Sequence, residues 1–123
     1  MASLADRVFD NGLTVLDTEA NKILLTSQEA TTYTEANATY ALGNSTSLSV
    51  GAPADRTNGG REVTVAAISD GSITASGTAT HYAVVDTVNS RLLATGSLTE
   101  SQVVTSGNTF TLGSFTIGIP DPA

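Results

Sequence analysis

The stretch from Thr78 to Ile119, TATHYAVVDTVNSRLLATGSLTESQVVTSGNTFTLGSFTIGI, decides the fold class of this chain. Its apolar and polar residues alternate with the two-residue period of half-buried strands, and the segments between turn residues are too short for helices. We therefore expect four short strands here, which the pattern places at 81–86, 91–95, 102–105 and 109–119. Ser106-Gly107-Asn108 is expected to form a three-residue hairpin loop, because glycine adopts positive φ. A shift of the apolar phase at Gly113 predicts a β-bulge within the last strand.

The strand pattern continues upstream of this stretch, in shorter runs separated by turn residues. Asp70-Gly71 is a two-residue signal for a β-hairpin, and Ala54–Gly60 has the composition of an exposed turn or loop. Val63 and Val65 are expected to share one face of their strand. The last strand should stop near Ile119, because the prolines that follow cannot extend a ladder. The further strands are expected, in chain order, at Lys22–Ser27 (buried), Ser47–Val50, Arg61–Ser69 and Ser72–Ala75.

A helical pattern occurs near the start of the sequence. Apolar residues at 4, 8, 9, 13 and 16 fall at helical spacing after Ser3, a residue type that caps helices. We expect an amphipathic helix from about Leu4 to about Thr18, although Gly12 costs roughly 1 kcal/mol inside it. The alternative is a helix that ends at Asn11-Gly12. The acidic residues of this helix, at 6, 10 and 17, are expected to form a solvated face.

The polar segment from Gln28 to Asn44 fits neither period well. Tyr33, Ala36 and Tyr40 are compatible with one face of a short helix, or with two tyrosines that anchor a long loop. We expect a long loop with a helical turn around Thr34–Tyr40. The whole pattern indicates a mainly β fold, an antiparallel β-sandwich or jelly-roll-like domain with a short N-terminal helix. We expect a single domain, with residues 1–20 as helix or arm, 21–119 as the sandwich and 120–123 as a tail.

Composition and charge restrict the possible functions. Of 123 residues, 33 are Ser or Thr, which suits the solvated faces of antiparallel sheets. The net charge is −7, with only five Lys and Arg residues, so a basic surface for DNA, RNA or an anionic membrane is not expected. No apolar run reaches the roughly 20 residues that span a bilayer. The absence of cysteine excludes disulfides and thiolate chemistry, and the first residues do not have the pattern of a secretory signal.

Catalytic and metal-binding motifs are missing from the sequence. His81 is the only histidine and has no evident nucleophile or orienting partner, so we interpret it as a surface or interface residue. The nearest carboxylate pairs, Asp17/Glu19 and Glu29/Glu35, lie in polar segments where exposure is expected. No phosphate-binding loop, dinucleotide fingerprint or calcium loop occurs. We expect no enzyme activity, no cofactor and no metal.

Three segments resemble small structural proteins of tailed bacteriophages and prophages. They are SQEATTYTEANATYALGN, VTVAAISDGSITASGTATHYAVVD and LLATGSLTESQVVTSGNTFTLGSFTIGIPD, and the resemblance extends from about Leu4 to Pro122. It implies a virion structural protein similar to capsid decoration (cement) proteins or to fibre-associated β-domains, and it carries no catalytic residue.

Several expectations follow from this resemblance. The chain would bind the major capsid protein on the outer surface of the virion, as a homo-oligomer (dimer or trimer), after synthesis in the host cytoplasm. The alternatives are a head or tail fibre domain and, in a different class, a glycan-binding module. The side chains expected at an interface are Leu4, Val8, Phe9, Tyr33 and Tyr40.

Overall fold

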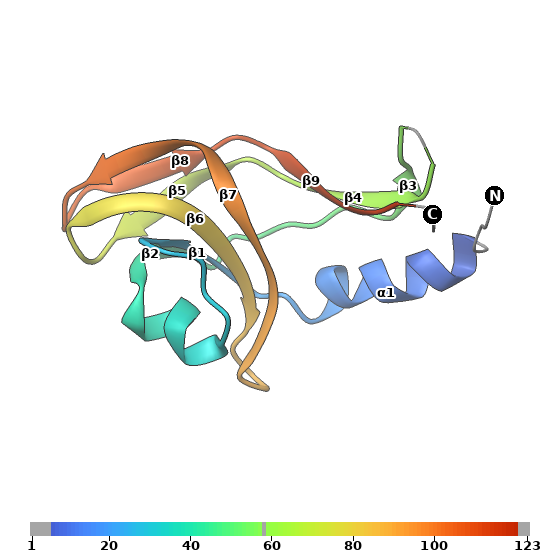
Figure 1. Ribbon diagram of the computed structural model, residues 1–123, viewed down its shortest axis with the longest axis horizontal. Helices are drawn as coiled ribbons and strands as arrows, with labels where there is room; N and C mark the ends of the chain where they lie inside the picture. Colours follow the sequence, from blue (N-terminus) through green and yellow to red (C-terminus); the bar gives the residue numbers. More distant parts are fainter. Residues whose placement is uncertain (1–5, 58, 121–123) are drawn as a thin grey trace. The chain divides into compact units, whose positions relative to one another are not determined.

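The structure is a computed structural model that describes residues 6–57 and 59–120 (Figure 1). Antiparallel strands dominate the fold, and the α-helix α1 (Asp6–Thr18) lies near the N-terminus. The predicted class, mainly β with antiparallel sheets and a short N-terminal helix, is therefore confirmed. The chain forms two compact units. The first combines the segment that ends at Glu19, residues 49–67 and the segment that starts at Gly113, and the second combines residues 20–48 and 68–112.

The second unit is built on a six-stranded antiparallel sheet. The strand order is β7-β6-β1-β2-β5-β8, so β7 and β8 form its two edges. Figure 1 shows that this sheet is strongly curled. The strands are β1 (Lys22–Thr26), β2 (Ala41–Ser45), β5 (Ile68–Ile73), β6 (Gly77–Asp86), β7 (Arg91–Val104) and β8 (Thr109–Leu112).

Glycines on one face of this sheet allow its curvature. Gly43 and Gly96 lie on the same face as Leu25, because Leu25 pairs with Gly43 and with Tyr82, which pairs with Gly96. Gly71 lies on this face too, because Gly43 pairs with Ile73, two residues farther along β5. A Cβ at Gly71 would lie 2.2 Å from the ring of Phe110, and one at Gly96 would lie 2.5 Å from the ring of Tyr82. Aromatic rings thus cover two strand glycines, an arrangement that supports tight sheet curvature.

The opposite face of the same sheet is covered by the segment between β1 and β2. Its short π-helix η1 (Glu35–Thr39) places Ala36 at 0% exposure. Leu24, Ala30, Ala36, Ala83 and Val85 form a buried cluster against which the tyrosines of this segment pack. Because both faces of β1 are covered, Ile23, Leu24 and Leu25 are all at most 1% exposed, as expected for a buried strand.

The first unit consists of α1 and a three-stranded sheet of order β3-β4-β9. The strands are β3 (Ala54–Asp55), β4 (Arg61–Val65) and β9 (Phe115–Ile119). Leu13 of α1 and Val63 and Val65 of β4 are buried, so the predicted valine face is confirmed. Helix α1 continues through Gly12 without a break, and the alternative of a helix ending there is wrong.

Arg61 connects three parts of this unit. Its Nε lies 2.9 Å from Asp10 Oδ1 on α1, and its Nη1 lies 2.7 Å from Asp55 Oδ1 on β3. The Arg61 side chain is only 16% exposed. Asp10 is therefore part of an ion pair that attaches α1 to β4, which corrects the expectation that the acidic residues of this helix only form a solvated face.

The predicted hairpin at Asp70-Gly71 is wrong. Strand β5 runs through both residues, and Gly71 pairs with Phe110 of β8. A two-residue turn would leave the Phe110 ring, which packs on the bare Gly71 backbone, without its contact surface. The strand expected at Ser72–Ala75 is the end of β5, and the single strand expected at Arg61–Ser69 is divided between β4 and the start of β5.

Three further differences concern the segment from 28 to 55. The long loop is shorter than expected, because Ala41–Ser45 form β2 between β1 and β5. The helical turn is present as η1. The strand expected at Ser47–Val50 is reduced to a single bridge between Val50 and Val65. Ala54 and Asp55, expected in a loop, form β3 because they pair with Glu62 and Arg61.

The stretch from Thr78 to Ile119 differs from its prediction in how its strands are divided and connected. Residues 91–95 and 102–105 were expected as separate strands, but Arg91–Val104 form the single strand β7. Gly107 has φ +93° as expected, yet its turn joins two strands that pair elsewhere, β7 with β6 and β8 with β5. The predicted bulge at Gly113 is instead the point where the chain leaves one sheet and enters β9 of the other.

Candidate functional site

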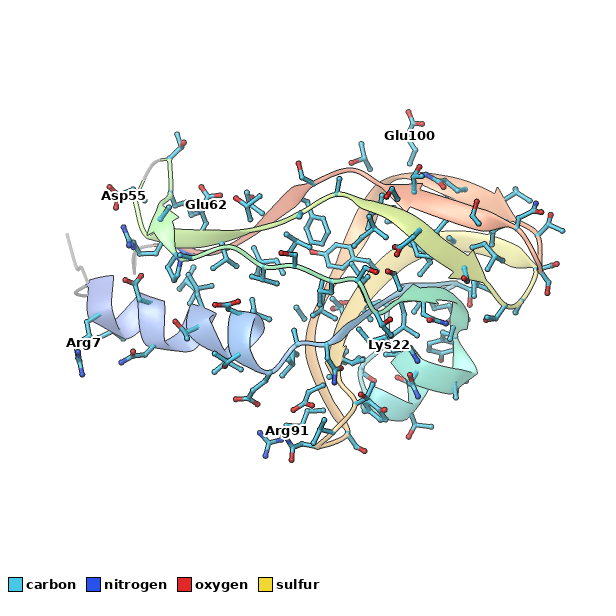
Figure 2. The ribbon with its side chains drawn as sticks, turned by 180° about the vertical axis from the view of Figure 1, so that it is seen from behind. Arg7, Lys22, Asp55, Glu62, Arg91 and Glu100 are labelled. Atoms are coloured by element: carbon cyan, nitrogen blue, oxygen red, sulfur yellow. The ribbon has the colours of Figure 1, made fainter. Side chains whose placement is uncertain are left out.

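The longer of the two edge strands of the six-stranded sheet, β7, is exposed near its C-terminal end. It has 14 residues and pairs on one side with β6. All five residues from Thr99 to Val103 are exposed, and Val103 is 83% exposed. Glu100 points away from the sheet (Figure 2). This part of β7 is therefore open to solvent on both of its faces.

The register of β7 is irregular within this open part. Ser97 pairs with His81 and Gln102 pairs with Ala79, so the four residues from Leu98 to Ser101 have no partner on β6 in the register. They lie within β7. The alternation of side chains along β7 slips between Ser97 and Gln102, because these two residues pair with His81 and Ala79, which lie on one face of β6.

The other end of β7 is fixed by a tight hairpin turn. Asp86, which is 2% exposed, accepts hydrogen bonds from the backbone N–H of Val88 and Asn89 and from the Asn89 side chain. These bonds, with the Asn89 amide contributing most, lower the pKa of the Asp86 carboxyl below its usual value. Val88 at the tip is 82% exposed. The turn is thus rigid at its base and presents one apolar side chain.

A groove of about 250 Å³ lies between the C-terminal end of β7 and β8. It is lined by Ile73, by residues 102–105 and by residues 108–111, and no side chain that lines it is ionisable at neutral pH. Amide groups of Gln102 and Asn108 and threonine hydroxyls supply its polar atoms. The groove can accept and donate hydrogen bonds, but its lining contains no general acid or base.

Three titratable side chains, Glu35, Asp70 and His81, interact with neighbouring residues of the chain. Glu35 accepts hydrogen bonds from the backbone N–H and the hydroxyl of Thr31, and these bonds lower its pKa. Hydrogen bonds from Ser47 and Ser45 lower the pKa of Asp70. His81 Nδ1 lies 2.8 Å from Thr80 Oγ1 within β6. Within residues 6–57 and 59–120, no three His, Asp or Glu side chains gather closely enough to hold a metal ion.

The five expected interface residues have different surroundings. Val8 on α1 is 55% exposed, which fits an interface position. Tyr33 and Tyr40 pack against the buried cluster around Ala36, so they also contribute to the core of their own unit. Leu4 and the side chain of Phe9 lie outside the described part of the chain. The interface role of all five residues stays a prediction.

Sequence reasoning did not identify the open part of β7 as a surface of interest. It divided the strand at Gly96–Ser101, because Ser, Thr and Glu there resemble a loop in composition. The apolar residues of this segment are at 98, 103 and 104, so they do not follow the two-residue period of a half-buried strand. Local sequence therefore contained no signal for a strand here.

Comparisons with known proteins leave the chain without an assigned family. No family model, no curated protein and no solved structure matches it. None of the described helices is long and apolar enough to cross a membrane.

Proposed function

We propose that this chain is a structural protein of a bacteriophage particle, a decoration or cement protein that binds the outer surface of the head and stabilises the shell. The observation that supports it is a 14-residue edge strand, open to solvent over 99–103, beside a groove whose lining carries no ionisable side chain. Such a surface binds through backbone hydrogen bonds and apolar contacts rather than through catalysis. The proposal includes no enzyme activity and no cofactor.

The partners in this proposal are the major capsid protein and sister copies of the chain, as a dimer or trimer. A decoration protein that binds the assembled shell, and not its free subunits, stabilises the shell by mass action. On a symmetric lattice, many weak contacts act together. The net charge of −7 disfavours contact with packaged DNA and supports a position outside the shell.

The groove favours a second candidate, a glycan-binding module. Its amide and hydroxyl groups are the types that bind sugar hydroxyls. However, the only aromatic ring that lines it, Phe110, is 5% exposed and packs on Gly71. Sugar sites often use an exposed ring as a stacking platform, and this groove has none, so we prefer the structural role.

The test compares phage particles with and without the protein. Particles that lack it should assemble but release their DNA at a lower temperature than complete particles. Equal heat resistance would exclude the cement role, and a few to a few dozen copies per particle, instead of hundreds, would favour a head or tail fibre domain.

A matched pair of variants tests the helix surface in the same assay. Val8→Lys should weaken particle binding, whereas Val88→Lys, at the hairpin tip, should not. Both residues are more than half exposed, so neither change should unfold the protein. Equal binding of the two variants would remove Val8 from the interface. Calorimetric binding of a sugar by protein that does not bind particles would favour the glycan module.

A further inference from the structure

We infer that Thr80 holds His81 in the tautomer that carries its proton on Nδ1, so that the neutral ring presents Nε2 to solvent as a hydrogen-bond acceptor. The ligand class that this nitrogen takes is an N–H or O–H donor. The inference does not depend on the virion assignment. It goes beyond the interpretation of His81 as a surface or interface residue, because it fixes what the ring can bind.

A chain of two hydrogen bonds connects the His81 ring to the neighbouring strand. His81 Nδ1 lies 2.8 Å from Thr80 Oγ1, and Thr80 Oγ1 lies 2.9 Å from the carbonyl oxygen of Ser27. Thr26 pairs with His81 in the register of β1 and β6, so Ser27, the next residue, lies beside Thr80. The ring is therefore attached to the end of β1 through one hydroxyl group.

The number of protons in this chain of bonds decides the tautomer. A carbonyl oxygen has no proton to donate, so the bond between Thr80 and Ser27 uses the hydroxyl proton of Thr80. A threonine hydroxyl has one proton, so its oxygen can only accept from the ring, and His81 Nδ1 must donate to it. In the opposite arrangement, the hydroxyl would donate to Nδ1, and lone pairs of two oxygen atoms would face each other 2.9 Å apart.

The second ring nitrogen, Nε2, has no hydrogen-bond partner among the residues that the structure describes. Within residues 6–57 and 59–120, every buried side-chain nitrogen or oxygen atom has such a partner, so Nε2 is in contact with solvent. In a neutral ring whose proton is on Nδ1, Nε2 carries a lone pair. His81 therefore presents an acceptor, and not a donor, to the surroundings of the protein.

This lone pair sets the chemistry of a ligand at His81. Hydroxyl, amide, ammonium and guanidinium groups can donate a proton to Nε2, whereas a carboxylate can only accept and is excluded while the ring is neutral. The net charge of −7 disfavours anionic ligands as well. The cross-strand neighbours of His81, Thr26 and Ser97, carry hydroxyl groups and no charge. Because Thr80 fixes the proton on Nδ1, no exchange of tautomers has to precede binding, and Thr80 is a positioning residue for this acceptor.

Nuclear magnetic resonance tests the tautomer directly, because His81 is the only histidine in the sequence. The protein is labelled with ¹⁵N-histidine and measured at a pH at which the ring is neutral. The resonance of Nδ1 should have the position of a protonated ring nitrogen, and that of Nε2 the position of a nitrogen with a lone pair. A soluble gadolinium chelate should broaden the signals of the ring protons beside Nε2, because this nitrogen contacts solvent.

Three variants of β6 provide the matched comparison. Thr80→Val removes the hydroxyl and keeps the shape of the side chain, so the ratio of the Nδ1–H form to the Nε2–H form should fall about fivefold, the factor that one hydrogen bond of typical net strength supports. Thr80→Ser retains the hydroxyl and should keep the ratio. Thr78→Val changes an exposed threonine on the same face of β6 and should also keep the ratio. Each spectrum is recorded well below the unfolding midpoint of its variant, so that a loss of stability does not affect the ratio.

Each other outcome overturns the inference. A proton mainly on Nε2 in the natural chain would show that Thr80 donates to the ring or that the ring is turned. An equal ratio in Thr80→Val and in the natural chain would show that Thr80 does not set the tautomer. Ring signals that stay sharp in the presence of the chelate would show that Nε2 is covered and accepts no ligand.

Discussion

The packing of Phe110 on Gly71 gives a prediction whose magnitude follows from the structure. A Cβ built on Gly71 lies 2.2, 2.3 and 2.5 Å from three ring atoms of Phe110, far inside van der Waals contact. The ring is buried and faces Gly71 across the β5–β8 pair, so it cannot move into solvent without losing its own contacts. Overpacking of this kind costs about 1–3 kcal/mol. Gly71→Ala should therefore lower the midpoint of thermal unfolding by about 4–12 °C, at about 4 °C per kcal/mol for a chain of this size.

Two other glycines separate the effect of space from the effect of backbone conformation. A Cβ at Gly113 or at Gly107 meets nothing within 4 Å, but Gly107 has φ +93°. Gly113→Ala should leave stability unchanged or raise it slightly, because alanine reduces the entropy of the unfolded chain. Gly107→Ala should cost about 1 kcal/mol through backbone strain alone. Far-UV circular dichroism during heating and urea titration measures all three variants.

A second change tests whether the Phe110 ring is the cause. In Phe110→Leu the ring is absent, so an alanine at position 71 should find space. The double variant should then be more stable than the sum of the two single losses predicts, by about 0.5–2 kcal/mol. If Gly71→Ala unfolds at the same midpoint as Gly113→Ala, or if the two changes are additive, the proposed packing of the ring on the glycine is refuted.

Three further predictions concern charge, helix attachment and cooperativity. The lowered pKa of Asp86 means that its contribution to stability is present above the ordinary carboxyl pKa of about 4 and is lost as the pH falls through its folded-state pKa. Asp86→Asn should therefore lower stability at pH 7 and flatten the loss of stability below about pH 4 in acid titrations of the unfolding midpoint. An unchanged acid profile would contradict this. Arg61→Ala should destabilise the chain by about 1–3 kcal/mol in urea unfolding, because it leaves Asp10 without its charged hydrogen-bond donor. Arg7→Ala, at an exposed residue of the same helix, should not change the stability. Equal effects of the two changes would exclude the Arg61–Asp10 pair as an attachment of α1. All three tyrosines lie in the second unit, and α1 lies in the first. Tyrosine fluorescence and the helical circular dichroism signal should therefore change at the same midpoint if the chain unfolds as the expected single domain. Two different midpoints would show that the units unfold separately.

The elements that sequence patterns predicted correctly depend on local periodicity. Lys22–Ser27 reads as a buried strand because all its central residues are apolar, and β1 is covered on both faces. The valines at 63 and 65 read as one buried face, and they are. Helix α1 continues through Gly12 because its apolar stripe extends on both sides of the glycine, and the resulting burial of Leu13 and Leu16 outweighs the low helix propensity of one residue.

The elements that were missed depend on contacts between distant residues. Asp70-Gly71 has the local chemistry of a turn, but the Phe110 ring 39 positions later requires a bare backbone there, and this contact keeps the pair in a strand. The sequence Ala41-Leu-Gly-Asn-Ser45 has weak strand propensity, yet it lies between β1 and β5, where neighbours on both sides satisfy its backbone. No local pattern contains these partners.

The candidate surface was only partly accessible from the sequence for the same reason. Val8 was expected at an interface because it lies in the apolar stripe of the helix, and its 55% exposure is compatible with that expectation. The exposure of residues 99–103 follows from strand order, since β7 is an edge only because β6 pairs on one side and nothing in the sheet order lies on the other. Strand order is a non-local property. Tyr33 and Tyr40 are the opposite case: the polar segment around them suggested exposed side chains, but both pack against the buried cluster around Ala36.

The turn after β7 explains why this edge stays open although the sheet is curled. Closure into a barrel would require β7 and β8 to pair, and the four-residue connection between them is short enough for a hairpin. Instead, Gly107 N–H donates to the carbonyl of Ile73 at 2.9 Å, Ile73 N–H donates to the carbonyl of Asn108 at 2.8 Å, and Ser106 N–H donates to Ser76 Oγ at 3.0 Å. These bonds fix the turn to the end of β5, so β8 continues beside β5 and not beside β7. The backbone contacts that hold β8 beside β5 therefore leave β7 as an edge strand of the six-stranded sheet.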